Sequence, residues 1–400
     1  MGKKEITVGL AASHGYPKSI VEDLQKELPE LFSFYVNDEC EWIVEYIVDP
    51  VTGITEKSEE VLESAGEKRQ EKGWDFVICI TDLPLLSGRK PIVAEASEGE
   101  RAAAISLPGL GSIPMVKRIK ESVLQLINEM YYGTSEKDRE QAENRIQSKD
   151  EGEHKELRNK SSKKLVGNRV VERLSPIHRE VPGTNTVENT IIDVRFFIKS
   201  RFSGALRMLT GMVRANRPWS MFPAFMKVIM IAFTTGSYAL IFPTLWMLST
   251  DYGLWRMAML TVISISAMVA WIILAHSLWE KTMEDRSNYL RKLYNIATVL
   301  TLFFTVCLYY LLLFFLFSVA VIVLIPTGML ESQLSKPPQF MDYFNIAWTA
   351  TSISTIIGAL GSALEKENVV LSATYGYRQR QRYELMKNEN SNTENEEGFQ

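Results

Sequence analysis

Two side chains in the first hundred residues, His14 and Asp82, have the types and positions that acid–base chemistry requires. His14 directly follows an apolar run, ITVGLAAS, and Asp82 comes shortly after a second run, FVICI. Both runs are typical of buried strands, and α/β proteins bind ligands beyond the carboxyl ends of such strands. A histidine and a carboxylate placed there can exchange protons with a substrate. His14 and Asp82 are therefore the candidate catalytic residues, and the alternative is that they form turns and caps.

No complete catalytic or cofactor motif accompanies these two residues. The glycines form neither GxGxxG nor GxxxxGK[ST], so neither common phosphate cradle is present. The histidines are His14, His154, His178 and His276, and no two have the spacing that would let them share a metal on a helix. The cysteines are Cys40, Cys79 and Cys307, which form no CxxC pair and indicate a reducing compartment. We expect no metal site and no cofactor, and we favour a non-enzymatic role.

The elements that would position His14 and Asp82 lie within residues 1–132. Apolar runs predict strands over 6–13, 42–48, 76–80, 90–96 and 102–107. Helical spacing of apolar residues predicts helices over 17–31 and 114–131, and a more polar one over 57–72. This order predicts an α/β domain with a mixed sheet.

Part of this domain resembles the archaemetzincin zinc proteases. The resemblance rests on TDLPL, the hairpin KPIVAEAS…RAAAISLPGL, and the helix that follows. Those enzymes carry HExxH on that helix, where two histidines bind zinc and the glutamate activates water. Here the helix is VKRIKESVLQLINEM, which has Glu121 and no histidine. The resemblance therefore implies a metal-free relative of that fold, a relic of a zinc protease.

A second resemblance is to methylenetetrahydrofolate dehydrogenase/cyclohydrolase enzymes. SGRKPIVAE is similar to their nucleotide motif GRSxxVGxP and keeps Gly88, Arg89 and Val93. Lys90 replaces the serine of the motif. The YxxxK motif of that family matches only at 383–387, near the end of the chain. This resemblance implies a folate-linked dehydrogenase as an alternative activity.

Residues 133–220 are predicted to connect this domain to a membrane. Residues 133–202 are mostly charged and polar, which predicts a largely disordered linker. Residues 203–220 have the pattern of an amphipathic juxtamembrane helix, with Arg207, Arg214 and Arg217 on its wet side. From 155 to 220 there are fourteen Lys/Arg against five Asp/Glu, which favours anionic lipid headgroups as a partner. Without interleaved aromatic residues, the same stretch does not suggest nucleic-acid binding.

Residues 221–365 are predicted to form an all-α transmembrane domain of four helices. A helix of roughly 20 apolar residues crosses the hydrocarbon of a bilayer. Four segments meet that length, and they cover 222–248, 254–278, 293–325 and 343–364. The third segment is longer than necessary, so it is expected to tilt or to begin within the headgroup layer.

The Lys/Arg bias of the connecting segments predicts the orientation of these helices. A lipid-facing basic belt is predicted on one side, formed by Arg207, Arg214, Arg217, Arg291, Lys292, Arg378, Arg380 and Arg382. Both termini and the domain 1–132 would then be cytoplasmic, in a multi-pass protein of a bacterial cell membrane. Residues 366–400 form a tail on that side that is first basic and then acidic.

The fourth predicted span carries a row of small residues every four positions, Ala350, Ser354, Gly358 and Ser362. Such rows let two helices approach closely, so the partner is either another span or a second protein chain. The overall layout, with GMVRANRPW, GALGSALE and YGYRQRQR, resembles an uncharacterised family of bacterial four-span membrane proteins, some of which carry the folate-dehydrogenase name. We expect a membrane protein whose α/β module binds or scaffolds, with an enzyme or a small transporter as alternatives.

Overall fold

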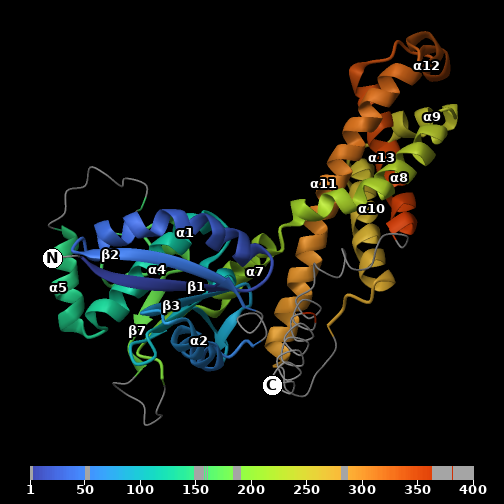
Figure 1. Cartoon of the computed structure of the whole chain (residues 1–400). Helices are drawn as coiled ribbons and strands as arrows, with labels where there is room; N and C mark the ends of the chain where they lie inside the picture. The colour runs from blue at the N-terminus through green and yellow to red at the C-terminus, as the bar shows by residue number, and fades with distance from the viewer. Residues whose placement is uncertain are drawn as a thin grey trace, which may run out of the picture. The chain divides into compact units, whose positions relative to one another are not determined.

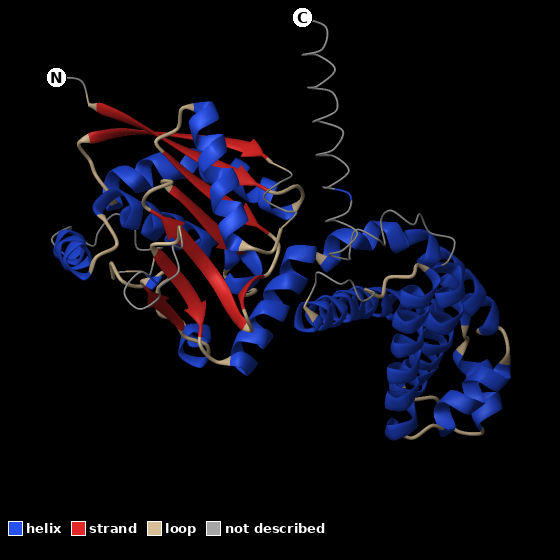
Figure 2. Cartoon of the chain, turned by 90° about the horizontal axis from the view of Figure 1, so that it is seen from below, coloured by secondary structure: helices blue, strands red, loops and turns tan. Residues whose placement is uncertain are grey.

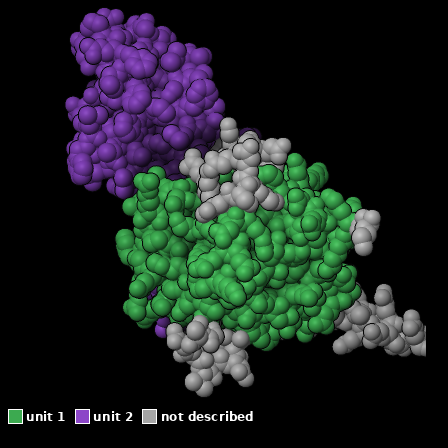
Figure 3. Space-filling view, turned by 90° about the vertical axis from the view of Figure 1, so that its left-hand side faces the viewer, with its two compact units in different colours: residues 1–216, 378–400 green, residues 217–377 purple. Residues whose placement is uncertain are grey.

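The computed structural model describes residues 3–49, 55–147, 157, 159, 161–182, 191–280, 287–362 and 381. Contacts along the chain divide it into two units, which Figure 3 colours separately. Unit 1 comprises residues 1–216 and 378–400, and unit 2 comprises residues 217–377.

Unit 1 is built on one mixed sheet, whose strands are the red arrows of Figure 2. The strand order is β2-β1-β3-β6-β5-β8-β7, and β4 pairs with β5 beside this path. β2, β1, β3 and β6 run parallel, and the other pairings are antiparallel. The strands are β1 (Lys4–Ala12), β2 (Cys40–Val48), β3 (Phe76–Thr81), β4 (Leu85–Ser87), β5 (Lys90–Ser97), β6 (Ala102–Ser106), β7 (Ile177–Glu180) and β8 (Val194–Ile198). The predicted α/β class with a mixed sheet is confirmed.

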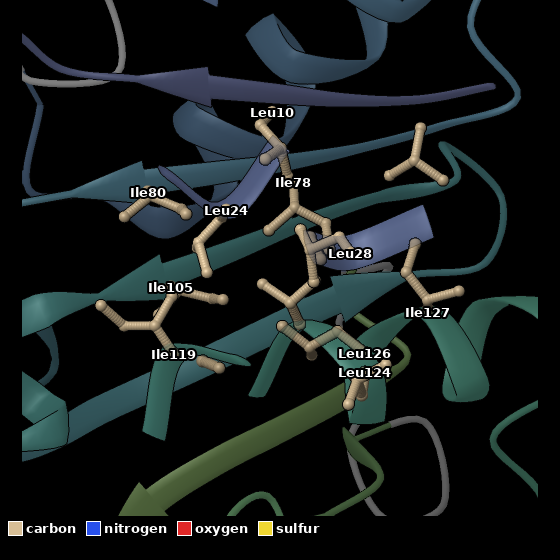
Figure 4. Packing of buried hydrophobic residues seen from close by; sticks show 14 of the residues in the cluster. Leu10, Leu24, Leu28, Ile78, Ile80, Ile105, Ile119, Leu124, Leu126 and Ile127 are labelled. Carbon is tan, nitrogen blue, oxygen red and sulfur yellow. The ribbon is translucent and has the colours of Figure 1, made fainter. Parts of the chain in front are cut away.

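Helices cover both faces of this sheet, as Figure 1 shows. α1 (Tyr16–Tyr35) and α4 (Met115–Tyr132) share one core with side chains of β1, β3 and β6, part of which is drawn in Figure 4. α2 (Ser58–Lys72) packs on the other face, against Val77 and Cys79. The two cores are separate because successive side chains of a strand point to opposite faces.

Unit 1 extends well beyond residue 132, because the antiparallel edge of its sheet is completed by later segments. β8 pairs with β5, and β7 pairs with β8. Val194, Phe196 and Ile198 of β8 are buried in the core. The prediction of a largely disordered linker over 133–202 is therefore wrong for β7, β8 and α5 (Glu136–Gln147). Residues 148–156 and 183–190 of that segment lie outside the described residues.

Three further helices complete unit 1, α3 (Leu107–Leu110), α6 (Val170–Leu174) and α7 (Arg201–Asn216). α7 packs closely on α3, since a Cβ on Gly211 would lie 2.3 Å from the carbonyl oxygen of Pro108. Only glycine permits this approach. The helix predicted as a separate juxtamembrane element is thus part of unit 1.

Unit 2 is helical throughout its described residues. It begins with the 3-10 helix η3 (Pro218–Phe225), and its α-helices are α8 (Met226–Ala239), α9 (Pro243–Asp251), α10 (Leu254–Ala275), α11 (Asn288–Leu324), α12 (Thr327–Leu334) and α13 (Phe340–Ser362). α10 and α11 are long and apolar enough to cross a membrane. A third span is counted if the helical segments Arg201–Met221 and Met226–Ala239, which are bent at a short break, form one span.

The predicted four spans are not all confirmed, for two local reasons. The first predicted span is interrupted, because α8 ends at Ala239 and α9 begins at Pro243. Proline lacks the N–H that would continue the helix. α13 is long enough, but the hydroxyl groups of Thr349, Thr351 and Ser352 make it less apolar than α10 and α11.

Candidate functional site

The candidate catalytic residues lie where the chain, having added a strand on one side of β1, adds the next strand on the other side. The chain passes from β1 through α1 to β2 on one side, and from β2 through α2 to β3 on the other side of β1. The carboxyl ends of β1 and β3 therefore meet at a topological switch point, where open α/β sheets bind ligands. The structure brings Ser13 and His14, which follow β1, to the same edge as Asp82, which follows β3.

Asp82 is enclosed at this edge, whereas His14 is exposed. The side chains of Ser13 and Asp82 have no exposed surface, and the Ser13 hydroxyl donates a hydrogen bond to Asp82 Oδ1 over 3.1 Å. His14 lies on the exposed turn before α1. A buried carboxylate that accepts a hydrogen bond from a buried hydroxyl fixes the geometry of two strand ends. This arrangement fits the capping alternative better than general acid–base catalysis.

The neighbouring hydroxyl groups also bond within the turns. Thr81 Oγ1 accepts a hydrogen bond from the backbone N–H of Leu83 over 3.1 Å. Ser106 Oγ donates to the carbonyl oxygen of Leu83 over 2.9 Å and accepts from the N–H of Gly109. Ser106 is thus the N-cap of α3. These contacts satisfy buried backbone groups that would otherwise be costly.

A second polar group, which the sequence did not single out, lies on the buried face of α4. Glu121 and Glu129 of α4 have at most 1% exposed surface. Arg169 forms two hydrogen bonds with Glu121, of 2.8 and 2.9 Å, and Arg179 forms two with Glu129, also of 2.8 and 2.9 Å. Such bidentate pairs between arginine and a carboxylate are strong and directional. They attach residues 161–180 to α4.

Arg139 of α5 joins the same group. It is fully buried, its Nε lies 3.6 Å from Glu129 Oε2, and it donates to the carbonyl oxygen of Asn128 over 2.8 Å. Gln125 donates to Glu129 Oε1 over 2.9 Å. The signal in the sequence was the spacing of Glu121, Gln125 and Glu129, which puts three polar side chains on one stripe of an apolar helix.

A third group of buried charges joins α4, α6 and α7, and we call it the Arg118–Glu172–Arg207 cluster. Glu172 Oε1 lies 2.8 Å from an Arg118 nitrogen and 3.2 Å from an Arg207 nitrogen. Arg207 also donates to the carbonyl oxygens of Gly109, Leu110 and Ser175 over 2.8–3.1 Å. Burial, and then the nearby Arg118, lower the pKa of Arg207 to about 10, so it stays cationic at neutral pH.

This cluster corrects the prediction for Arg207. Arg207 was expected on the wet side of an amphipathic helix, facing lipid headgroups, but only 3% of its surface is exposed. Leu206, on the predicted apolar side, is instead exposed. The buried stripe of α7 combines Arg207 and Gly211 from the predicted wet side with Met208 and Met212 from the predicted apolar side.

The structure describes some of the other members of the predicted basic belt. Arg214 is half-buried on α7, and Arg217 directly follows that helix. Arg291 and Lys292 lie in the first turns of α11, where Lys292 is exposed. Arg378, Arg380 and Arg382 lie outside the described residues. Lipid contact by these seven residues stays a prediction.

No group of three or more potential metal ligands occurs among the described residues. On α4, where the archaemetzincin resemblance would place a zinc motif, the buried carboxylates of Glu121 and Glu129 bind arginines. A surface hollow of about 320 Å³ lies between α1 and α4, lined by Lys26, Glu27, Glu30, Leu31, Lys117, Lys120 and Leu157. Its mostly charged lining differs from the apolar walls of typical small-molecule sites.

The small residues of α13 face other helices of unit 2. Ala350 and Ser354 are buried. A Cβ on Gly236 of α8 would lie 1.9 Å from Ser354 Oγ, and one on Gly358 would lie 2.3 Å from the Tyr309 hydroxyl of α11. The partners of this row are thus helices of the same chain. The side chain of Ser362 lies outside the described residues.

Replacing Gly236 with valine is expected to destabilise unit 2 by about 1–3 kcal/mol, because the new side chain must displace Ser354 and Phe317. The measurement follows the reaction of the half-buried Cys307 with a thiol reagent while the full chain is heated in detergent. The loss of stability appears as a lower transition temperature. Gly253→Ala is the matched control, since nothing lies within 4 Å of its added Cβ. Equal transition temperatures for the two variants would refute the packing of α8 on α13.

Together, these features define a mixed-sheet α/β unit followed by a helical unit with two candidate membrane spans. No family model matches the chain, and no curated protein matches it. Among solved structures, archaemetzincin from Methanopyrus kandleri is similar at 16% sequence identity. That similarity covers 32% of this chain and 73% of the archaemetzincin chain, with a TM-score of 0.24.

Proposed function

We propose that this chain is an integral membrane protein whose α/β unit works as a binding or scaffolding module without catalysis. One observation carries the proposal. Three buried carboxylates of unit 1, which include those at the candidate sites, are held in structural pairs, Asp82 with Ser13, Glu121 with Arg169 and Glu129 with Arg179. Each of these carboxylates is enclosed in the fold and bonded to a side chain of another segment, so it fixes the shape of unit 1.

The enzyme alternative makes a direct prediction. If His14 and Asp82 act on a substrate, His14→Ala abolishes turnover, and we expect only a small change in stability because His14 is exposed. We expect instead that the purified full chain turns over neither folate nor peptide substrates, with or without this substitution. Turnover by the native chain that His14→Ala removes would overturn the proposal.

We also propose four membrane spans, formed by α8 with α9, by α10, by α11 and by α13. α13 has 23 residues, which span about 34 Å at 1.5 Å per residue. Its hydroxyl groups do not exclude it from a bilayer, because Thr351 and Thr355 donate to the carbonyl oxygens of Ala347 and Thr351 on their own helix. These side chains are buried within unit 2 and do not face lipid.

Four spans place both termini on one side of the membrane, and the Lys/Arg bias makes that the cytoplasmic side of a bacterial cell. Reporter fusions after Tyr252, after Glu280, after Lys336 and after Gln400 test this arrangement. The expected signals are outside, inside, outside and inside, in that order. An external signal after Gln400, or equal signals after Glu280 and Lys336, would contradict it.

A small transporter is the second alternative from the sequence. Transporters usually place ionisable side chains or broken helices at a midplane site. Two of the buried hydroxyl groups of α11, those of Thr301 and Thr305, donate to carbonyl oxygens one turn back along their own helix. This observation favours helix packing over a polar cavity, and substrate flux in liposomes that contain the full chain would contradict it.

A further inference from the structure

The exposed apolar side chains of unit 1 are concentrated in one part of its fold. In the described part of unit 1, eight large apolar side chains are exposed, and all but Ile43 lie on α6, on α7 or at the start of α4. Phe202, Leu174 and Val170 are 83%, 74% and 72% exposed. We define the outward apolar patch as Ile113, Val116, Val170, Leu174, Phe202 and Leu206. Soluble surfaces rarely gather apolar side chains in this way unless the patch has a partner.

Two of these elements bury a charged side chain while they expose large apolar ones. In α6, Glu172 is buried while Val170 and Leu174 are exposed. In α7, Arg207 is buried while Phe202 and Leu206 are exposed. Burying a charge while exposing leucine and phenylalanine is unfavourable if water covers the outer face. The arrangement becomes favourable when the outer face meets a second apolar medium.

The Arg118–Glu172–Arg207 cluster explains why the patch is in one place. Glu172 of α6 binds both Arg118 of α4 and Arg207 of α7, so one carboxylate links all three elements that carry the patch. Arg207 adds a hydrogen bond to the carbonyl oxygen of Ser175, directly after α6. The buried charges thus fix three short segments so that their apolar side chains point outward.

The charges around the patch indicate what covers it. The exposed charged side chains of α6 and α7 are Arg173 and Arg201, and Lys117 is exposed at the start of α4. The acidic side chain of α6, Glu172, is buried in the cluster. Exposed cations beside apolar side chains fit the surface of a bilayer with anionic headgroups, where the cations meet phosphates and the apolar groups enter the acyl boundary.

We propose that unit 1 docks on a phospholipid bilayer through the outward apolar patch, with its buried arginine–glutamate cluster as the internal support. This inference rests on the proposed membrane insertion of unit 2, because α7 continues directly into that unit. It replaces the predicted contact of Arg207 with headgroups by contacts of Phe202, Leu206 and Leu174 with the acyl boundary.

Fluorescence quenching in a bilayer tests the docking. The full chain with Cys307→Ser, whose remaining cysteines Cys40 and Cys79 are buried, is labelled at Leu174→Cys or Phe202→Cys with a polarity-sensitive dye. It is reconstituted in vesicles of phosphatidylcholine and phosphatidylglycerol that contain nitroxide-labelled lipid. The reference is a label at Glu71→Cys, an exposed position on α2. Compared with this reference, we expect the labels at 174 and 202 to be quenched several-fold more strongly by the lipid nitroxide and more weakly by aqueous iodide.

The other outcomes are distinguishable. Labels at 174 and 202 that iodide quenches as strongly as the label at 71 would overturn the docking, and labels shielded from both quenchers would show a protein on the patch instead of lipid. A label at Leu311→Cys, which is 62% exposed on α11, reports insertion of unit 2 separately. Lipid quenching at 311 without quenching at 174 and 202 overturns only the docking, whereas no quenching at 311 overturns the proposed insertion.

Discussion

Replacing Glu129 with alanine is expected to lower the stability of unit 1 by about 3–5 kcal/mol, because it leaves buried arginines without a counter-charge. Glu129 is fully buried, accepts two hydrogen bonds from Arg179 and one from Gln125, and lies 3.6 Å from Arg139. The cost is large because an unpaired charge in the interior cannot recover its hydration. Amide hydrogen exchange of β1 and β3 in the full chain measures the loss without assuming that the two units unfold together.

Two further variants separate this effect from a general sensitivity to substitution. Glu71→Ala removes an exposed carboxylate that pairs with Lys68 at 3.0 Å, and we expect a change below about 0.5 kcal/mol. Glu129→Gln keeps the shape and one acceptor, so its loss should be intermediate. The double variant Glu129→Ala with Arg179→Ala should lose less than the sum of its single variants. A Glu129→Ala protein as stable as Glu71→Ala would disprove the structural role of the α4 carboxylates.

Arg207→Ala is expected to release α6 and α7 from the rest of unit 1, with a local loss of about 3 kcal/mol or more. The substitution leaves the carbonyl oxygens of Gly109, Leu110 and Ser175 without this donor, and it removes one of the two arginines that hold Glu172. Faster hydrogen exchange in α6 and α7 is the expected observation, and it should occur in detergent without any anionic lipid.

The independence from lipid is the decisive part of this prediction. If Arg207 contacted headgroups, its removal would matter only in anionic bilayers and would leave the exchange rates in neutral detergent unchanged. Arg201→Ala is the matched control, because Arg201 is exposed on the same helix. We expect Arg201→Ala to leave exchange in detergent as it is in the native chain.

The alternating strands and helices of residues 4–132 were predictable because local patterns dominate there. β1, β3 and β6 are continuous apolar runs that only a covered sheet can bury, and α1 and α4 show clear helical spacing of apolar residues. The places of His14 and Asp82 at the ends of two strands were predictable for the same reason, since these residues directly follow or nearly follow such runs. Whether Asp82 faced a ligand or Ser13 was not predictable, because that depends on how two strand ends distant in sequence meet.

The attachment of segment 133–216 to the sheet could not be predicted from its composition. Beside the buried apolar side chains of β8 and α7, its anchors are Arg139, Arg169, Arg179 and Arg207, which in a sequence are typical of solvated or lipid-facing segments. Each finds a buried carboxylate or a set of carbonyl oxygens on another element. Long-range pairing of charges leaves no periodic signal, so the same residues that suggested a linker are those that fasten it to the sheet.

The sequence alone determined the two-part character of the protein, because long apolar runs such as α10 and α11 and the apolar strands of the sheet are local properties of the chain. It also predicted α7 as a helix with arginines on one side and apolar residues on the other. Only the tertiary structure decided which of these side chains are inside. Burial of Arg207 beside Glu172 and the carbonyl oxygens around α3 is favourable only when those groups are already gathered there, and that gathering turns Leu206 and Phe202 outward.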